Sequence, residues 1–291
     1  MKVSPKTRAA VLSEALPYLQ RFAGKVIVVK YGGNALADSS EDSMVVFARD
    51  IALLHAVGIK PVVVHGGGPQ ITAMMERLGK KPNFHNGLRV TDAETIEIVS
   101  MVLLGSVNPM FVTLINQSGA NAAGVSGADV GLFQCVQRDP ALGFVGDIVS
   151  VNPMAVQGLL DDGVVPVVAT LGTDTSGQSY NINADTAASA LAVSLKAQKI
   201  LFLTDIAGVL RNPADAESLL PTLTPADITQ LTKEGVISGG MIPKLDSCLH
   251  AVHGGVSAAH ILDGRVSHVT LLELLTDTGV GTMVVADGAA A

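Results

Sequence analysis

The segment Val62-Val63-Val64-His65-Gly66-Gly67-Gly68-Pro69-Gln70 joins a run of β-branched residues to three glycines and a proline. The valines do not alternate with polar residues, so they predict a strand that is buried on both faces. The glycines let the backbone approach a ligand closely, and Pro69 suits the first turn of a helix. As an isolated feature this could be no more than a tight turn. A strand, a turn and a helix N-terminus in succession nevertheless form a place where free N–H groups attract anions.

The same alternation of apolar runs and helical segments extends outward along the chain. It predicts an α/β protein, a three-layer α/β/α sandwich with a mostly parallel central sheet. Ligands are then expected beyond the carboxyl ends of the strands. The predicted strands are 26–29, 61–64, 122–125, 133–136, 148–151 (forming a hairpin with the preceding one), 164–169, 200–204, 259–262 and 283–285. The predicted helices are 4–23, 44–57, 69–78, 93–104, 111–116, 154–161, 185–195, 225–234 and 242–251, and the type of 271–275 stays open.

The first predicted helix precedes the first strand and is therefore an extension to the sandwich. Ser4-Pro5 fits an N-cap followed by proline at the first helical position, and Pro17 is expected to kink the helix. Its apolar residues recur at helical spacing along one face. Two interpretations stay open: a terminal helix packed on its own core, or an arm for oligomerisation.

Composition excludes several classes of function. The chain has 291 residues, 48% hydrophobic and 15% charged, with a formal net charge of −7. An acidic chain without tryptophan and with 3% aromatic residues is not suited to a long basic surface or a stacking platform for nucleic acid. The uncharged stretch 98–128 is interrupted by polar residues, so no membrane span is predicted. The isolated Cys135 and Cys248 indicate a reduced, cytoplasmic protein, and the histidines lack the spacing of a metal site.

Two lysines far apart in the sequence each lie beside a glycine pair. Lys30 follows a predicted strand and precedes Gly32-Gly33, while Lys244 follows Gly239-Gly240 at the start of a predicted helix. Either lysine alone could be a solvated surface residue. Two cations facing one glycine-lined site would instead suit the transfer of a phosphoryl group.

Three further segments carry polar residues of the right type for substrates. Arg89, in Asn86-Gly87-Leu88-Arg89-Val90-Thr91-Asp92, could clamp a carboxylate with two parallel hydrogen bonds or be a surface arginine. In Tyr180-Asn181-Ile182-Asn183-Ala184-Asp185, the last two polar residues could cap the following helix, or Asn181 could bind substrate while Asp185 orients the lysines. Thr204-Asp205-Ile206-Ala207-Gly208-Val209 leaves a strand in a loop that suits a nucleotide-binding crevice.

Taken together, these motifs resemble the amino acid kinase family, from about Lys25 to the C-terminus. Lys30-Tyr31-Gly32-Gly33 and His65-Gly66-Gly67-Gly68 are shared across the family, whereas the Asn86–Thr91 and Asn181–Asp185 segments are typical of its members that act on N-acetyl-L-glutamate. The resemblance implies ATP-dependent phosphorylation of the side-chain carboxylate of that substrate, in arginine biosynthesis. It implies a substrate lobe at 25–196 and an ATP-binding lobe at 197–291, with 1–24 as the N-terminal arm.

The resemblance also assigns roles to residues. The lysines would stabilise charge on the transferred group, Asp185 would organise them, and ATP would carry Mg²⁺ without a dedicated protein metal site. The implied catalytic residues are Lys30, Lys244 and Asp185; the substrate-binding residues are Gly33, Gly67, Gly68, Arg89 and Asn181; the nucleotide-binding residues are Thr204, Asp205, Gly208, Val209, Gly240 and Met241.

Regulation and assembly follow from the same resemblance. An extension before the first strand resembles the arm that joins dimers into a hexamer, a trimer of dimers, in arginine-inhibited members of the family. The residues implied for an allosteric arginine site are Tyr18, Lys199, His268, Glu273 and Gly281.

Two other functions compete with this one. A sibling kinase could act on aspartate, glutamate, carbamate or UMP, but Arg89 in its context argues against it. A non-catalytic arginine sensor on the same fold would not need Lys30, Asp185 and Lys244 together. A nicotinamide dehydrogenase is disfavoured because the chain has no GxGxxG motif after a strand.

Overall fold

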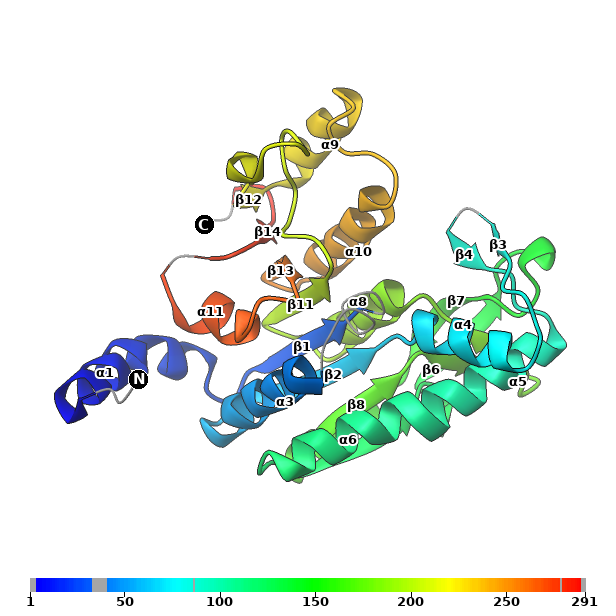
Figure 1. Ribbon diagram of the computed structural model, residues 1–291, viewed down its shortest axis with the longest axis horizontal. Helices are drawn as coiled ribbons and strands as arrows, with labels where there is room; N and C mark the ends of the chain where they lie inside the picture. Colours follow the sequence, from blue (N-terminus) through cyan, green and yellow to red (C-terminus); the bar gives the residue numbers. More distant parts are fainter. Residues whose placement is uncertain (1–3, 33–40, 86, 278, 289–291) are drawn as a thin grey trace.

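An eight-stranded sheet forms the centre of the computed structural model, which describes residues 4–32, 41–85, 87–277 and 279–288 (Figure 1). The strand order is β12-β14-β13-β11-β1-β2-β8-β5, and the run from β13 to β5 is parallel. At the other edge, β14 is antiparallel to β13. The strands are β1 (Val26–Tyr31), β2 (Lys60–His65), β5 (Ala122–Ser126), β8 (Val165–Ala169), β11 (Lys199–Thr204), β12 (Thr222–Leu223), β13 (Ala258–Asp263) and β14 (Thr282–Val284).

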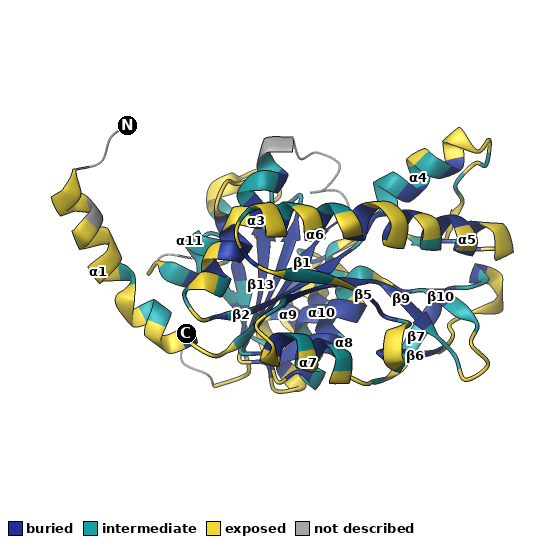
Figure 2. Ribbon diagram, turned by 90° about the horizontal axis from the view of Figure 1, so that it is seen from below, coloured by how far each residue is buried: buried dark blue, intermediate teal, exposed yellow. Residues whose placement is uncertain are grey.

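Helices cover both faces of this sheet, so the predicted three-layer α/β/α sandwich is confirmed (Figure 2). In β1, Ile27 and Val29 point into one hydrophobic core and Val28 into the other, which explains why the strand lacks polar alternation. The first core includes residues of α3 (Glu41–Ala56), α5 (Ala93–Val102), α6 (Asn108–Gln117) and α11 (Val269–Leu275). The second includes residues of α7 (Met154–Asp161), α8 (Ala184–Ser194), α9 (Pro225–Lys233) and α10 (Met241–His253), and both cysteines are free and buried.

A smaller sheet of order β10-β9-β6-β7 lies beside the main one. β6 (Phe133–Gln137) and β7 (Gly146–Val151) form the predicted antiparallel hairpin. β9 (Leu171–Thr173) and β10 (Ser179–Asn181) were not predicted, because each is only three residues long and polar residues surround them. A short hairpin of β3 (Phe84–His85) and β4 (Leu88–Arg89) was missed for the same reason, and its two strands follow α4 (Gly68–Arg77).

Helix α1 (Pro5–Phe22) begins as predicted, with the Ser4 hydroxyl accepting a hydrogen bond from the Thr7 N–H at 3.1 Å. Its last residue, Phe22, is buried in the core. Farther out, Val11, Leu12 and Leu16 are 57%, 69% and 50% exposed. Figure 2 shows α1 projecting from the body of the molecule, so its apolar face is left uncovered by this chain.

The longest helical run joins α5 to α6 through a π-helical segment, Leu103–Val107. Pro109 lies two positions after this segment; a proline removes one helical hydrogen bond and crowds the preceding turn, which accounts for the local widening. By length and composition, Ala93–Gln117 could cross a membrane. Its Val99, Val102, Phe111 and Ile115 are instead buried in the core against the sheet.

Candidate active site

Lys30 lies near the carboxyl end of β1, in the middle of the main sheet. It is in register with Phe202 of β11 and Val64 of β2, so strands flank it on both sides. Its side chain is 7% exposed, and a buried ammonium group needs an anionic partner. That partner is Asp185, whose Oδ1 is 2.6 Å from Lys30 Nζ.

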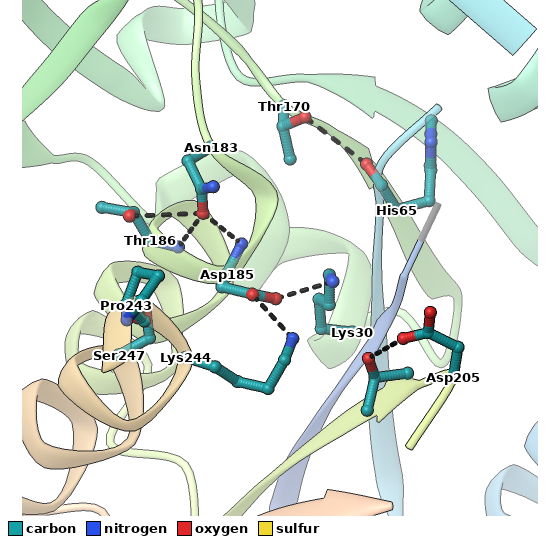
Figure 3. Close-up of polar contacts among 11 residues, drawn as sticks. Lys30, His65, Thr170, Asn183, Asp185, Thr186, Asp205, Pro243, Lys244 and Ser247 are labelled. Carbon is teal, nitrogen blue, oxygen red and sulfur yellow. Dashed lines mark hydrogen bonds and ion pairs between the residues drawn. The ribbon is translucent and has the colours of Figure 1, made fainter. Parts of the chain in front are cut away.

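Asp185 bridges the two lysines from the first turn of α8. Lys244 Nζ, at the start of α10, lies 3.1 Å from Asp185 Oδ2, and Figure 3 shows the carboxylate between the two ammonium groups. The cap of α8 is Asn183, whose Oδ1 accepts hydrogen bonds from the N–H groups of Asp185 and Thr186 at 2.9 and 3.1 Å. Because Asn183 caps the helix, the Asp185 carboxylate is left to pair with the lysines.

The electrostatics of this triad keep a net positive charge facing the site. Burial opposes ionisation of Asp185, but the two neighbouring ammonium groups outweigh it and lower its pKa to about 2. Burial lowers the pKa of Lys30, and the charge of Asp185 partly offsets this. Two lysines against one carboxylate therefore leave one positive charge for an anionic ligand.

The triple-glycine turn supplies hydrogen-bond donors beside the triad. Gly66, Gly67 and Gly68 all line the same cavity as Lys30. The first N–H groups of a helix have no partner within it, so those of Gly67 and Gly68, at the start of α4, are suited to an anion. A Cβ at Gly67 would come within 2.6 Å of Leu103 Cδ2, so a larger residue here would force the Leu103 side chain to shift.

Arg89 is buried in the cavity wall without an acidic partner among the described residues. It is the last residue of β4 and is 7% exposed. Its guanidinium donates to the Gly68 carbonyl and to Thr72 Oγ1, both at 2.8 Å, and stacks over the Phe84 ring at 4.7 Å. Burial lowers its pKa, yet arginine stays charged in proteins. A buried cation without a carboxylate favours binding of an anionic ligand from the cavity.

Asn181 lines the same cavity from the end of β10. Its amide donates to Thr91 Oγ1 at 3.4 Å, and the Thr91 hydroxyl donates in turn to the Arg89 carbonyl at 2.9 Å. This chain of contacts links the residue to the strand that carries Arg89. Both predicted substrate contacts outside the glycine turn therefore line one cavity and are connected through Thr91.

One cavity of about 630 Å³ contains these groups and continues toward the ends of β11 and α10. Among the residues predicted to bind nucleotide, Thr204, Asp205, Gly240 and Met241 line it. Gly208 and Val209 do not line it and pack on Thr282 instead: a Cβ at Gly208 would meet Thr282 Oγ1 at 2.5 Å, and the Val209 N–H donates to that oxygen at 2.8 Å. Gly33 lies outside the described residues.

Sequence reasoning missed several lining residues. Phe84, Thr170 and Asn183 all face the cavity, and Leu88 and Val145 add apolar surface. Only Phe84 could have been noticed in the sequence, because it is an aromatic residue in a polar segment of a chain with few aromatic residues. In the structure it is 53% exposed. No group of three His, Cys, Asp or Glu side chains suited to a metal occurs in the described parts of the chain.

The residues predicted for an effector site lie away from this cavity, around α1 and α11. The Tyr18 hydroxyl donates to the Asp277 carboxylate, and Lys199 Nζ lies 5.5 Å from the centre of the Phe22 ring. Glu273 accepts from His260 Nδ1 at 2.7 Å and from the Val280 N–H at 2.9 Å.

The other two predicted effector residues have separate surroundings. His268 Nδ1 is 2.7 Å from Asp50 Oδ1 of α3. Gly281 packs on β13, where a Cβ would meet the Ile261 carbonyl oxygen at 2.2 Å.

Comparison with known proteins agrees with this geometry. Residues 25–263 match the amino acid kinase family. The chain is 50% identical over 284 residues to the acetylglutamate kinase of Trichodesmium erythraeum, and the match covers 97% of both proteins. Among solved structures it is similar to N-acetylglutamate synthase from Neisseria gonorrhoeae complexed with coenzyme A and N-acetyl-glutamate, at 26% identity and a TM-score of 0.84.

That match covers 97% of this chain but 64% of the synthase, so the chain spans about two thirds of that enzyme's length. The same synthase complexed with coenzyme A and L-arginine gives a TM-score of 0.78 at 26% identity, covering 95% of this chain and 65% of the synthase. The match of 239 consecutive positions to the family, 25–263, includes the complete Lys30–Asp185–Lys244 triad. On these grounds the chain belongs to the amino acid kinase family.

Proposed function

We propose that the protein transfers the γ-phosphoryl group of ATP to the side-chain carboxylate of N-acetyl-L-glutamate, giving N-acetyl-L-glutamyl 5-phosphate and ADP in arginine biosynthesis. The observation that carries this proposal is the Lys30–Asp185–Lys244 triad, which shares a cavity with the glycine turn and with the buried Arg89. The near-full-length identity to an acetylglutamate kinase supports the choice of acceptor.

In the proposed reaction a carboxylate oxygen of the acceptor attacks the γ-phosphorus. The bond from that phosphorus to the β,γ-bridging oxygen breaks, and ADP leaves with the electron pair. The acceptor is already ionised at neutral pH, so the step needs no general base. Lys30 and Lys244 stabilise negative charge on the transferred group, while the Gly67 and Gly68 N–H groups donate to its oxygens.

The charges and hydrogen-bond donors of the cavity are suited to ATP with its metal. The ammonium groups and free N–H groups suit phosphates, and Thr204, Asp205, Gly240 and Met241 would contact the nucleotide. Mg²⁺ is usually held by substrate phosphates, water and one or two carboxylates; because the lining Asp185 is paired with two lysines, the lining Asp205 would serve. When bound, Mg²⁺ would supply further positive charge to the phosphates. We assign 25–196 to the acceptor lobe and 197–291 to the ATP lobe.

A panel of acceptors tests the proposed function. ADP release should be fastest with N-acetyl-L-glutamate among N-acetyl-L-glutamate, glutamate, aspartate, carbamate and UMP, each supplied with MgATP. Best turnover on one of the other acceptors would overturn the assignment in favour of a sibling kinase. No ADP release with any acceptor would favour the non-catalytic alternative.

Replacing Arg89 by lysine should raise KM for N-acetyl-L-glutamate by about 100-fold, since a lysine cannot bind a carboxylate with two parallel hydrogen bonds. KM for ATP should change little, because Arg89 contacts Gly68 and Thr72 rather than the nucleotide wall. Steady-state kinetics with each substrate varied separately measures this. A rise in KM for ATP alone would show that Arg89 binds the nucleotide, which would contradict its assignment to N-acetyl-L-glutamate.

Regulation and assembly form a second part of the proposal. The uncovered apolar face of α1, with Val11, Leu12 and Leu16, would pack against a second copy and join dimers into a hexamer. Arginine would bind near Tyr18, Lys199 and Glu273, where α1 meets α11, with His268 and Gly281 in the same C-terminal segment. The protein would act in the cytoplasm.

Removing residues 1–24 should abolish arginine inhibition and reduce the hexamer to dimers. Activity measured against arginine concentration, together with light scattering, checks both effects in one preparation. The substitution Leu12→Glu in the full chain is the matched control, since it should disrupt the arm contact without deleting Tyr18. Activity of the full-length enzyme that does not change with arginine concentration would contradict the proposed effector site.

A further inference from the structure

His65 is a buried polar residue to which the proposed transfer step assigns no role. It is the last residue of β2, is 0% exposed and stacks on Phe111 with ring centres 5.4 Å apart. Burial lowers its pKa to about 4, so the imidazole is neutral at physiological pH. A neutral, buried imidazole has one N–H donor and one acceptor nitrogen.

The neighbours of His65 determine which nitrogen is which. Nδ1 lies 2.9 Å from the Gly66 carbonyl oxygen, which can only accept, so Nδ1 carries the hydrogen. Nε2 lies 3.0 Å from Asn108 Nδ2, whose other hydrogen goes to the Val167 carbonyl at 2.8 Å. Hydrogen bonds therefore run in one direction, from Asn108 to His65 and from His65 to Gly66.

The π-helical segment and a glycine make room for this arrangement. Asn108 follows the segment directly and is a buried polar residue, 6% exposed. Its Oδ1 lies against Gly124 of β5, where a Cβ would come within 2.0 Å of that oxygen. Leu103, from the same segment, closes the space behind Gly67. π-bulges of this kind often accompany functional sites.

The carbonyl that His65 holds belongs to the peptide whose N–H is that of Gly67. In a planar trans peptide the C=O and N–H point in opposite directions, so fixing the Gly66 carbonyl also fixes the Gly67 N–H. The preceding peptide is held as well: the Gly66 N–H donates to the Tyr31 carbonyl at 3.3 Å, and Thr170 Oγ1 donates to the His65 carbonyl at 3.5 Å (Figure 3). Gly67 itself lines the cavity.

We propose that His65, held by Asn108, is a positioning residue that orients the Gly66–Gly67 peptide so that the Gly67 N–H faces the phosphoryl group in transfer. This inference rests on the proposed function. His65 acts through the backbone and touches neither substrate. A donor fixed in advance stabilises the transition state without reorganisation, so its loss should appear in kcat more than in KM.

Two near-isosteric replacements separate the two hydrogen bonds of His65. In His65→Asn the side-chain amide occupies the place of Nδ1 and can still donate to the Gly66 carbonyl. In His65→Gln the amide reaches the place of Nε2, keeps the contact with Asn108 and loses the bond to Gly66. We expect kcat to fall by about 10- to 100-fold in His65→Gln and by less than about fivefold in His65→Asn, with KM values for both substrates within about threefold.

Asn108→Leu tests the other end of the arrangement, and Asn116→Leu is its matched control. Asn116 also lies on α6 and accepts from the Ala122 N–H of β5 at 2.7 Å, but it is remote from the glycine turn. Asn108→Leu should lower kcat by about 10-fold, whereas Asn116→Leu should lower the melting temperature without lowering kcat. The shape of the pH profile should be the same in all variants between about pH 6 and about pH 9, because His65 does not titrate there.

Each outcome decides the matter. Equal losses of kcat in His65→Asn and His65→Gln, or losses confined to KM or to melting temperature, would overturn the positioning role, as would the removal of an ionisation from the pH profile. Should the His65 variants fail to fold, unchanged kcat in Asn108→Leu would overturn it alone. Wild-type protein that releases no ADP with N-acetyl-L-glutamate would instead refute the proposed function.

Discussion

The Lys30→Met variant is expected to turn over at least about 1,000-fold more slowly than the wild type, with little change in KM for N-acetyl-L-glutamate. Methionine keeps most of the volume of the side chain but removes the charge that meets the transferred group. Lys30 lies on a strand paired on both sides and forms an ion pair with Asp185 at 2.6 Å, so its ammonium group is fixed beside the site of transfer. Single-turnover measurement of phosphoryl transfer checks the chemical step directly.

Lys60→Met provides the matched control. Lys60 opens the strand beside β1 and forms an ion pair with Asp161 at 3.1 Å, but its side chain is 35% exposed and lies outside the cavity. Exposed ion pairs contribute little to stability, so this variant should keep wild-type kcat. Full turnover by Lys30→Met would remove Lys30 from the catalytic residues.

Asp185→Asn should lower kcat by about 100-fold and shift the pH dependence of what activity remains. The asparagine keeps the shape of the bridge but leaves Lys30 and Lys244 side by side without a negative charge between them. Burial already lowers the pKa of Lys30, and Asp185 is the main influence that raises it. Without the carboxylate that pKa falls further, so the ammonium group is lost at a lower pH.

The sign of the shift is therefore fixed. The alkaline limb of the pH–kcat profile should lie at lower pH in Asp185→Asn than in the wild type. The acidic limb should not shift to higher pH. A full pH–kcat profile of both proteins measures the displacement. Asp161→Asn, which alters only exposed contacts of Asp161 with Lys60 and Gln157, should have the wild-type profile. A shift of the alkaline limb to higher pH would contradict the assigned role of Asp185.

The central strands were predictable from sequence because burial on both faces leaves a simple pattern. Val26–Val29 and Pro61–Val64 are uninterrupted apolar runs. Each is part of a strand whose two faces are buried in two different hydrophobic cores, which helices cover. The glycine clusters then located the site, since glycines after buried strands collect at one edge of a parallel sheet. Lys30 and Lys244 could be expected there because each lies beside a glycine pair, whereas the role of Asp185 stayed open between helix cap and partner of the lysines.

Other parts of the site left no comparable pattern. β10 carries Asn181 but is only three residues long, and its place is set by pairing with β9 and by the Val145–Asn181 bridge. The choice between Asn183 and Asp185 as the cap of α8 depended on where Lys30 and Lys244 lie in space. The contact of Asn108 with His65 joins positions that only the packing of α6 on the sheet brings together.

The place of β1 in the sheet also governs how the chain must fold. β1 precedes the other described strands of the sheet in the sequence, yet Ile27 pairs with Lys199, about 170 positions later. Its other neighbour, β2, follows within one helix. A nascent chain therefore carries β1 with one bare, apolar edge until β11 has left the ribosome, and such edges invite pairing with other chains. Contacts at this separation slow folding, so the strand that bears Lys30 gains its second neighbour late.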